Sequence, residues 1–262
     1  AIFGFAGADA RSTQNFIDKW EPEILPLSIT YRCPKVVVES VKGIVPDYEA
    51  APTAPDGEII ESSIEQMYLL WKAGDVCISA TNAPTVKHCL AAWRQGKKAM
   101  VLGKDFADEL KKLIKRSESH TVVEFLGWLS DYVQQETERL LAMKRNEQIE
   151  KLDDIEETLI ALCEGLSTIE QVNSRMEMVF ADDPKDGCIL LTSTHKFKGG
   201  EAAVIWMFSD TYKPTGRVYE VGELIEPSDC LWYVARTRVM GVAGDPDSGK
   251  LYLVPVKVGK KG

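Results

Sequence analysis

Residues 76–102 have the sequence VCISATNAPTVKHCLAAWRQGKKAMVL, and this stretch decides the class of fold. It opens with a run of apolar and β-favouring residues, 76–80, which predicts a strand. Residues 81–84 supply N-cap candidates and then a proline, and an apolar period of three to four continues to Gly96, which predicts a helix and its end. A second apolar run at 99–102 predicts another strand. Strand, helix, strand is typical of a parallel α/β sheet.

The hydrophobic period becomes helical between residues 105 and 180. Two patterns in this region, Thr121-x-x-Glu124 and Ser167-x-x-Glu170, predict capping boxes at which helices begin. We expect about four helices here, whose apolar stripes are core faces.

The α/β pattern returns after Gly187. Apolar runs predict strands at 188–192 and 203–208, then a helix at 229–240, and alternating faces predict a terminal strand at 250–258. The chain is therefore expected to form a sheet domain interrupted by a helical insertion. The predicted divisions are 1–104 for the first part of the sheet domain, 105–181 for the insertion and 182–262 for the second part.

Composition and charge limit the classes of function. The chain has 262 residues, of which 45% are hydrophobic, so it can bury a substantial core. A net charge of -9 argues against a protein that coats nucleic acid by bulk electrostatics, so any DNA contact must be local. No apolar run approaches a membrane span, and residues 1–5, which open the first motif, show no basic region followed by an apolar stretch and a cleavage site. Because the first residue, Ala1, opens inside that motif, we expect the chain to be a fragment.

The six cysteines are scattered without a C-x-x-C pair. This spacing suggests neither a zinc site nor a disulfide framework. A reducing cytoplasm is the expected compartment, with no partner in a membrane.

Two segments near the start carry aromatic and basic residues. Residues 2–9, IFGFAGAD, place Phe3 and Phe5 at i and i+2, where two flat rings could stack on single-stranded bases. Packing of both rings at a core edge is the alternative. Residues 27–34, LSITYRCP, contain the pair Tyr31-Arg32, which taken alone is typical of a surface.

Two further segments lie in the second α/β part. In residues 191–201, LTSTHKFKGGE, a strand ends in a glycine-containing turn that carries Ser193 and His195. A structural role for the histidine is the alternative to a functional one. Residues 231–238, LWYVARTR, end in Arg238, and a guanidinium stays charged and offers several donors to phosphate oxygens.

In this order, the four segments resemble motifs of the UvrD/Rep-type superfamily-1 DNA helicases: I-[YF]-x-[FW]-R-G-A, then L-x-x-N-Y-R-S, T-x-H-x-x-K-G-L-E and L-x-Y-V-A-x-T-R. The strand, helix and strand between the second and third segments resemble the family as well, so the likeness covers the chain from end to end. It implies a RecA-like parallel sheet of the P-loop NTPase type, the second motor domain, with a shortened form of the family's mobile inserted domain.

The resemblance also implies roles for single residues. Tyr31 would stack on adenine, and Arg32 and Arg238 would reach the γ-phosphate of ATP as the catalytic arginines. Gly199 and Glu201 would contact the nucleotide, with the carboxylate accepting from the ribose. The DNA-binding residues would be Phe3, Phe5, Ser193 and His195, with single-stranded DNA as partner and 3′-to-5′ movement.

The resemblance places the phosphate loop and the Mg²⁺ ligands in an N-terminal RecA-like domain, expected upstream of Ala1. The complete protein would be an ATP-dependent DNA helicase or translocase, and these 262 residues alone would be inactive. Residues 244–250, GDPDSGK, satisfy G-x-x-x-x-G-K, but Leu251 follows in place of Ser or Thr, and Asp245 and Asp247 would repel phosphate. We therefore predict a turn between strands there.

Several positions depart from the family pattern, and they motivate a rival hypothesis. Thr30 stands where the family has asparagine. The rival rests on Ala6 in place of an arginine, on Gly200 in place of a leucine and on Cys230, which with Ser228 and Asp229 occupies the family's acidic and paired arginine positions. Arg32, Glu201 and Arg238 are intact and oppose it. A helicase-derived interaction module without motor activity would explain such losses. The sequence decides neither among repair, recombination and replication nor which DNA junction is preferred.

Overall fold

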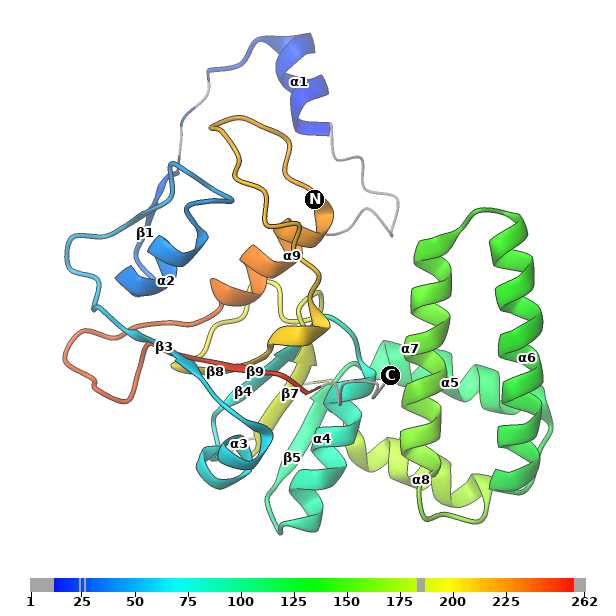
Figure 1. The fold of residues 1–262 in the computed structure, drawn as a ribbon. Coiled ribbons are helices and arrows are strands. Elements are labelled where there is room, and N and C mark those ends of the chain that lie inside the picture. The colour runs from blue at the N-terminus through cyan, green and yellow to red at the C-terminus, as the bar shows by residue number, and fades with distance from the viewer. Residues whose placement is uncertain (1–11, 24, 26, 183–186, 257–262) are drawn as a thin grey trace. The chain divides into compact units, whose positions relative to one another are not determined.

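The computed structural model describes residues 12–23, 25, 27–182 and 187–256, and Figure 1 shows their course. Seven strands form a parallel sheet in the order β3-β9-β8-β4-β7-β5-β6, so the predicted α/β class is confirmed. In that order they are Glu58–Glu61, Lys250–Val254, Val204–Phe208, Val76–Ser79, Ile189–Ser193, Ala99–Leu102 and Phe180–Ala181.

Burial explains why these runs form strands. All four residues of β4 and of β5 are buried, which is typical of parallel strands covered on both faces. At the β3 edge of the sheet, Glu58 and Glu61 are exposed instead. Charged side chains at an edge discourage pairing with a further strand.

The described residues divide into two compact units. The first unit holds residues 12–70, 78–80 and 197–256, and the second holds 71–77 and 81–196. Residues 105–181 thus fall in one unit with the helix at 83–94 and the strand at 99–102 that precede them, whereas the strand at 76–79 is divided between the two units.

The second unit contains the predicted helical region. After α4 (Ala83–Arg94), four helices follow, as the hydrophobic period predicts (green in Figure 1). They are α5 (Lys104–Ser117), α6 (Val122–Ala142), α7 (Asn146–Cys163) and α8 (Ile169–Val179).

One of the two predicted capping boxes is confirmed, and the other is displaced by one residue. Thr121 and Glu124 cap α6 reciprocally, as predicted. At α8 the box is formed by Thr168 and Gln171 rather than by Ser167 and Glu170. Both pairs fit the pattern, but the Thr168 backbone also forms a bridge with Thr121, which fixes Thr168 as the last extended residue.

A carboxylate from α7 caps the N-terminus of α4. Asp154 accepts hydrogen bonds from the backbone N–H groups of Asn82, at 2.8 Å, and Ala83, at 2.7 Å, and from the Asn82 side chain at 2.9 Å. Helix N-terminal amides lack intrahelical partners and favour negative charge. The inserted helices therefore supply the cap of a helix that lies earlier in the chain.

The first unit holds the remaining helices. They are α1 (Ser12–Trp20), α2 (Lys35–Val41), α3 (Ile64–Leu70) and α9 (Pro227–Arg236), with the 3-10 turn η2 (Ser209–Thr211). A short parallel pair, β1 (Ile29–Thr30) with β2 (Glu49–Ala50), precedes and follows α2.

Helix α9 ends four residues before its predicted end at residue 240. The Thr237 hydroxyl donates to the carbonyls of Tyr233 and Val234, and Arg238 Nε donates to Val234 O at 2.9 Å. These bonds satisfy the last carbonyls of the helix, whose end the apolar period alone does not mark. Arg238 therefore lies just beyond the helix.

The G-x-x-x-x-G-K segment is a turn, as predicted. The Ser248 hydroxyl accepts from Val242 N at 2.8 Å and donates to nearby carbonyls, and Lys250 begins β9 rather than a helix. Strand β9 ends at Val254, earlier than predicted, because Pro255 cannot donate to the ladder. The predicted residues 257 and 258 lie outside the described part. No helix in the ranges that the structure describes is both long and apolar enough to cross a membrane.

Candidate functional site

Residues 237–241, directly after α9, connect three segments of the first unit. Gly241 N donates to Arg32 O at 3.0 Å. On another side, Ala202 N donates to Arg238 O at 3.1 Å, and Met240 N donates to Ala202 O at 2.8 Å. These backbone bonds therefore hold Arg32 and Ala202, the residue after Glu201, next to the segment that carries Arg238.

A local turn shapes the backbone around Arg32. The Thr30 hydroxyl accepts from Arg32 N at 3.2 Å and from Cys33 N at 3.3 Å. Short polar side chains commonly hold a turn in this way. Threonine thus provides a side-chain acceptor at the position where the family motif has asparagine.

The side chains of Arg32 and Glu201 form an ion pair. Arg32 Nε lies 2.5 Å from Glu201 Oε2, and the two side chains are 33% and 43% exposed. The contact lacks hydrogen-bond geometry, and Arg32 Nε is buried without a hydrogen-bond partner in the described structure. A buried N–H that lacks a well-aligned acceptor favours an additional anionic ligand.

Arg238 is close enough to Arg32 for their charges to interact. Burial lowers the pKa of Arg238, and the positive charge of Arg32 lowers it further. Among the described residues, the acceptors of Arg238 are neutral, namely Val234 O, Gly200 O at 3.4 Å and the Thr237 hydroxyl. Two guanidinium groups whose charges interact in a half-buried place are suited to a polyanion.

A polar cluster of the buried Cys33 and the half-buried Tyr48 and Tyr233 lies near Arg238. The Cys33 thiol lies 3.4 Å from the Tyr48 hydroxyl and 3.5 Å from Thr237 O. The Tyr48 and Tyr233 rings meet edge to face with centroids 5.6 Å apart. Burial, followed by the neighbouring thiol, raises the pKa of Tyr48, so this hydroxyl stays protonated. The sequence offers no signal for the contribution of Tyr48.

The remaining residues predicted to bind nucleotide lie at the surface of the first unit. Tyr31 is 82% exposed, so its ring is accessible for stacking. Gly199 adopts a φ of +95° in the turn before Glu201, a conformation that favours glycine.

Of the four residues predicted to bind DNA, the structure describes two. Ser193 ends β7 in the second unit, and His195 follows in the next turn, each half-buried. Phe3 and Phe5 lie outside the described residues.

Gly200 replaces the leucine of the family motif because the Phe197 ring occupies the neighbouring space. A Cβ at Gly200 would lie 2.6 Å from Cε2 of Phe197, and that ring is buried. The Phe197 ring therefore fills the space that a leucine side chain would take at position 200. The exchange of leucine for glycine removes no polar group.

We expect Gly200→Leu to destabilise the first unit by about 1–3 kcal/mol, the usual cost of overpacking. The measurement is chemical denaturation, with the same substitution repeated in a Phe197→Ala background. In the Phe197→Ala background, Gly200→Leu should hardly change the free energy of unfolding, because the ring that clashes with leucine is absent. An equal cost in both backgrounds would show that Phe197 is not the obstacle.

A second buried cluster surrounds Asp229 on α9, one of the positions that departs from the family pattern. This carboxylate accepts from Thr215 N at 2.7 Å, from the Thr215 hydroxyl, and from the Tyr219 hydroxyl at 2.6 Å. Burial acts to raise the pKa of Asp229, but these hydrogen bonds outweigh it and lower the pKa. Asp229 thus anchors the loop before α9, a role that the sequence did not predict.

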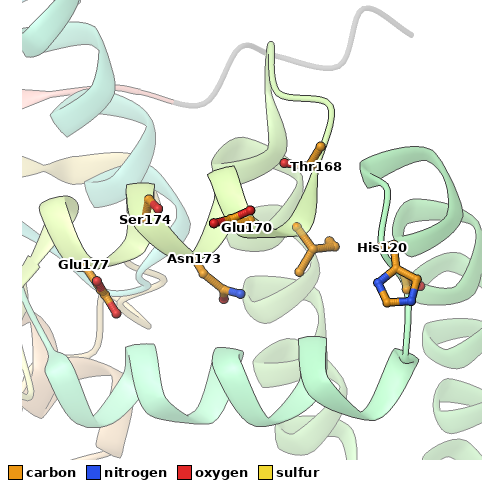
Figure 2. Close-up of a pocket in the computed structure, with 8 residues that line it drawn as sticks. His120, Thr168, Glu170, Asn173, Ser174 and Glu177 are labelled. Atoms are coloured by element: carbon orange, nitrogen blue, oxygen red, sulfur yellow. The ribbon is translucent and has the colours of Figure 1, made fainter.

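A hollow of about 480 Å³ lies in the second unit, away from every residue predicted for a site. Figure 2 shows His120 at one side and Glu170 and Asn173 of α8 at the other. Among the described residues, no group of three or more His, Cys, Asp or Glu side chains is placed to hold a metal ion.

No protein-family model matches the chain, and no curated protein matches it.

Proposed function

We propose that the chain is part of an ATP-dependent DNA helicase or translocase of the UvrD/Rep type, in which it forms the second motor domain. The observation that carries the proposal is the convergence of Arg32, Glu201 and Arg238 in one place of the first unit. These residues come from three separate motifs, and the resemblance had assigned all three to one nucleotide.

Arg32 and Arg238 are suited to bind the polyphosphate of a nucleotide. Arg32 Nε contacts the Glu201 carboxylate as an ion pair without hydrogen-bond geometry, and burial together with Arg32 disfavours the charged form of Arg238. An anion bound between the two guanidinium groups would give Arg32 Nε a well-aligned acceptor and would stabilise the charged form of Arg238. ATP would supply the γ-phosphoryl group, and its Mg²⁺ would be held by a first RecA-like domain.

In this proposal the chemistry of the chain is electrostatic and positional. Arg32 and Arg238 would stabilise the charge that grows on the phosphoryl oxygens during transfer. The exposed Tyr31 ring would stack on the base, and Glu201 would accept from the ribose. Ser193 and His195 would contact single-stranded DNA, with movement in the 3′-to-5′ direction.

The test compares these 262 residues alone with the same chain joined to its first motor domain. The chain alone should show no DNA-stimulated ATP hydrolysis, because no phosphate loop or acidic Mg²⁺ motif occurs in its sequence. The complete protein should hydrolyse ATP when single-stranded DNA is added and should unwind duplexes with a 3′ tail. DNA binding without hydrolysis in the complete protein would favour the interaction-module hypothesis.

A further inference from the structure

Three glycines enclose Pro34, two residues after Arg32. A Cβ at Gly57 would lie 2.3 Å from Pro34 Cβ, and one at Gly249 would lie 3.1 Å from Pro34 Cγ. A Cβ at Gly241 would lie 3.1 Å from Pro34 Cγ and only 2.5 Å from Pro55 Cγ. We call Gly57, Gly241 and Gly249 the glycine cage.

Gly241 differs from the other two members in its backbone. Gly57 and Gly249 have φ values of +70° and +74°, which favour glycine by conformation. Gly241 is outside that region, so its backbone would accept any residue. Only the close approach of Pro55 and Pro34 excludes a side chain there.

The glycine cage is joined to the backbone that carries both arginines. Gly241 N donates to Arg32 O, and Met240 and Arg238 pair with Ala202 next to Glu201. On the other side of Pro34, Lys35 N donates to Pro55 O at 2.9 Å. A displacement of Gly241 would therefore shift Arg32 relative to Arg238.

We propose that Gly241 is a positioning residue, which sets the spacing of Arg32 and Arg238 by letting residues 237–241 approach Pro34 and Pro55 without a side chain between them. The inference rests on the proposed function, because it assumes that both arginines act on one phosphoryl group. Misplacement of catalytic groups by about 1 Å can cost on the order of 10²-fold in rate.

The experiment measures DNA-stimulated ATP hydrolysis by the complete protein. Gly241→Ala should lower kcat by about 10²-fold, whereas KM for ATP and the Kd for single-stranded DNA should change less than about twofold. Gly241→Ala combined with Pro55→Ala should regain most of the turnover of Pro55→Ala alone, since the nearest clashing atom is removed. Gly43→Ala is the matched control, because its Cβ would lie an ordinary 3.9 Å from Val218 Cγ2.

The outcomes separate this inference from the proposed function. A folded Gly241→Ala protein with wild-type kcat, or one whose lost turnover Pro55→Ala does not restore, would overturn the positioning role alone. If Gly241→Ala does not fold, the double variant is compared with Pro55→Ala alone. Turnover near that of Pro55→Ala supports the positioning role of Gly241. Turnover below about a tenth of it overturns that role. A wild-type protein without DNA-stimulated hydrolysis would overturn the proposed function and the positioning role together.

Discussion

Arg238→Ala in the complete protein should reduce DNA-stimulated ATP turnover by about 10³ to 10⁵, the range in which arginine fingers act. Arg238 is half-buried, its charge interacts with that of Arg32, and its hydrogen-bond acceptors in the described part of the chain are neutral. Its charge is therefore available to a phosphoryl group. Because that interaction strengthens in the transition state, kcat should fall far more than DNA affinity.

Arg238→Lys should restore little of the turnover. A lysine returns the charge but lacks the planar fork that lets Arg238 donate to Val234 O and to a phosphate oxygen at once. Steady-state kinetics with a parallel DNA-binding titration makes the measurement, and Arg139→Ala, an exposed arginine of α6 paired with Glu136, is the control. Near-normal hydrolysis in a folded Arg238→Ala protein would contradict the assignment of this motif.

The second large predicted effect is a loss of folding stability when Asp229 is replaced. Asp229→Ala should lower the free energy of unfolding by about 2–4 kcal/mol, because it leaves the buried Tyr219 hydroxyl and the Thr215 backbone N–H without their charged acceptor. Urea denaturation measures the loss. Glu39→Ala, which removes an exposed pair with Lys42, should cost at most about 1 kcal/mol.

The contribution of Asp229 should also depend on pH. Its pKa is lower in the folded chain than in the unfolded chain, so the carboxylate stabilises the fold fully above the unfolded value of about 3.9. That contribution is lost as the pH falls through the folded pKa. The stability difference between wild type and Asp229→Asn should therefore narrow below about pH 4, and a difference constant down to pH 2 would exclude this linkage.

The fold could be predicted largely because its strands are continuous apolar runs. β4, β5 and β8 are buried nearly throughout, and such runs stand out in the sequence without any partner being known. The ends of helices and strands were harder to predict from the sequence. Helix α9 ends where the Thr237 and Arg238 side chains bond to its last carbonyls, and no periodicity encodes that.

The site could be predicted only in part, and the reason is again physical. Motif spacing pointed to Arg32, Glu201 and Arg238, which the backbone of residues 237–241 brings together. Their partners Gly241 and Tyr48 act through close packing between distant segments, which a linear pattern does not record. Roles in ATP and DNA binding stay predictions until the kinetic experiments are done.

The bond between Asp154 and the start of α4 has a consequence for how the protein can be shortened. An engineer who replaced residues 105–181 with a short linker would remove the acid that satisfies the amides of Asn82 and Ala83. The same deletion would remove β6, the parallel neighbour of β5. The inserted helices are thus not a detachable accessory, and a minimal version would need a substitute acid beside α4 and a replacement edge strand.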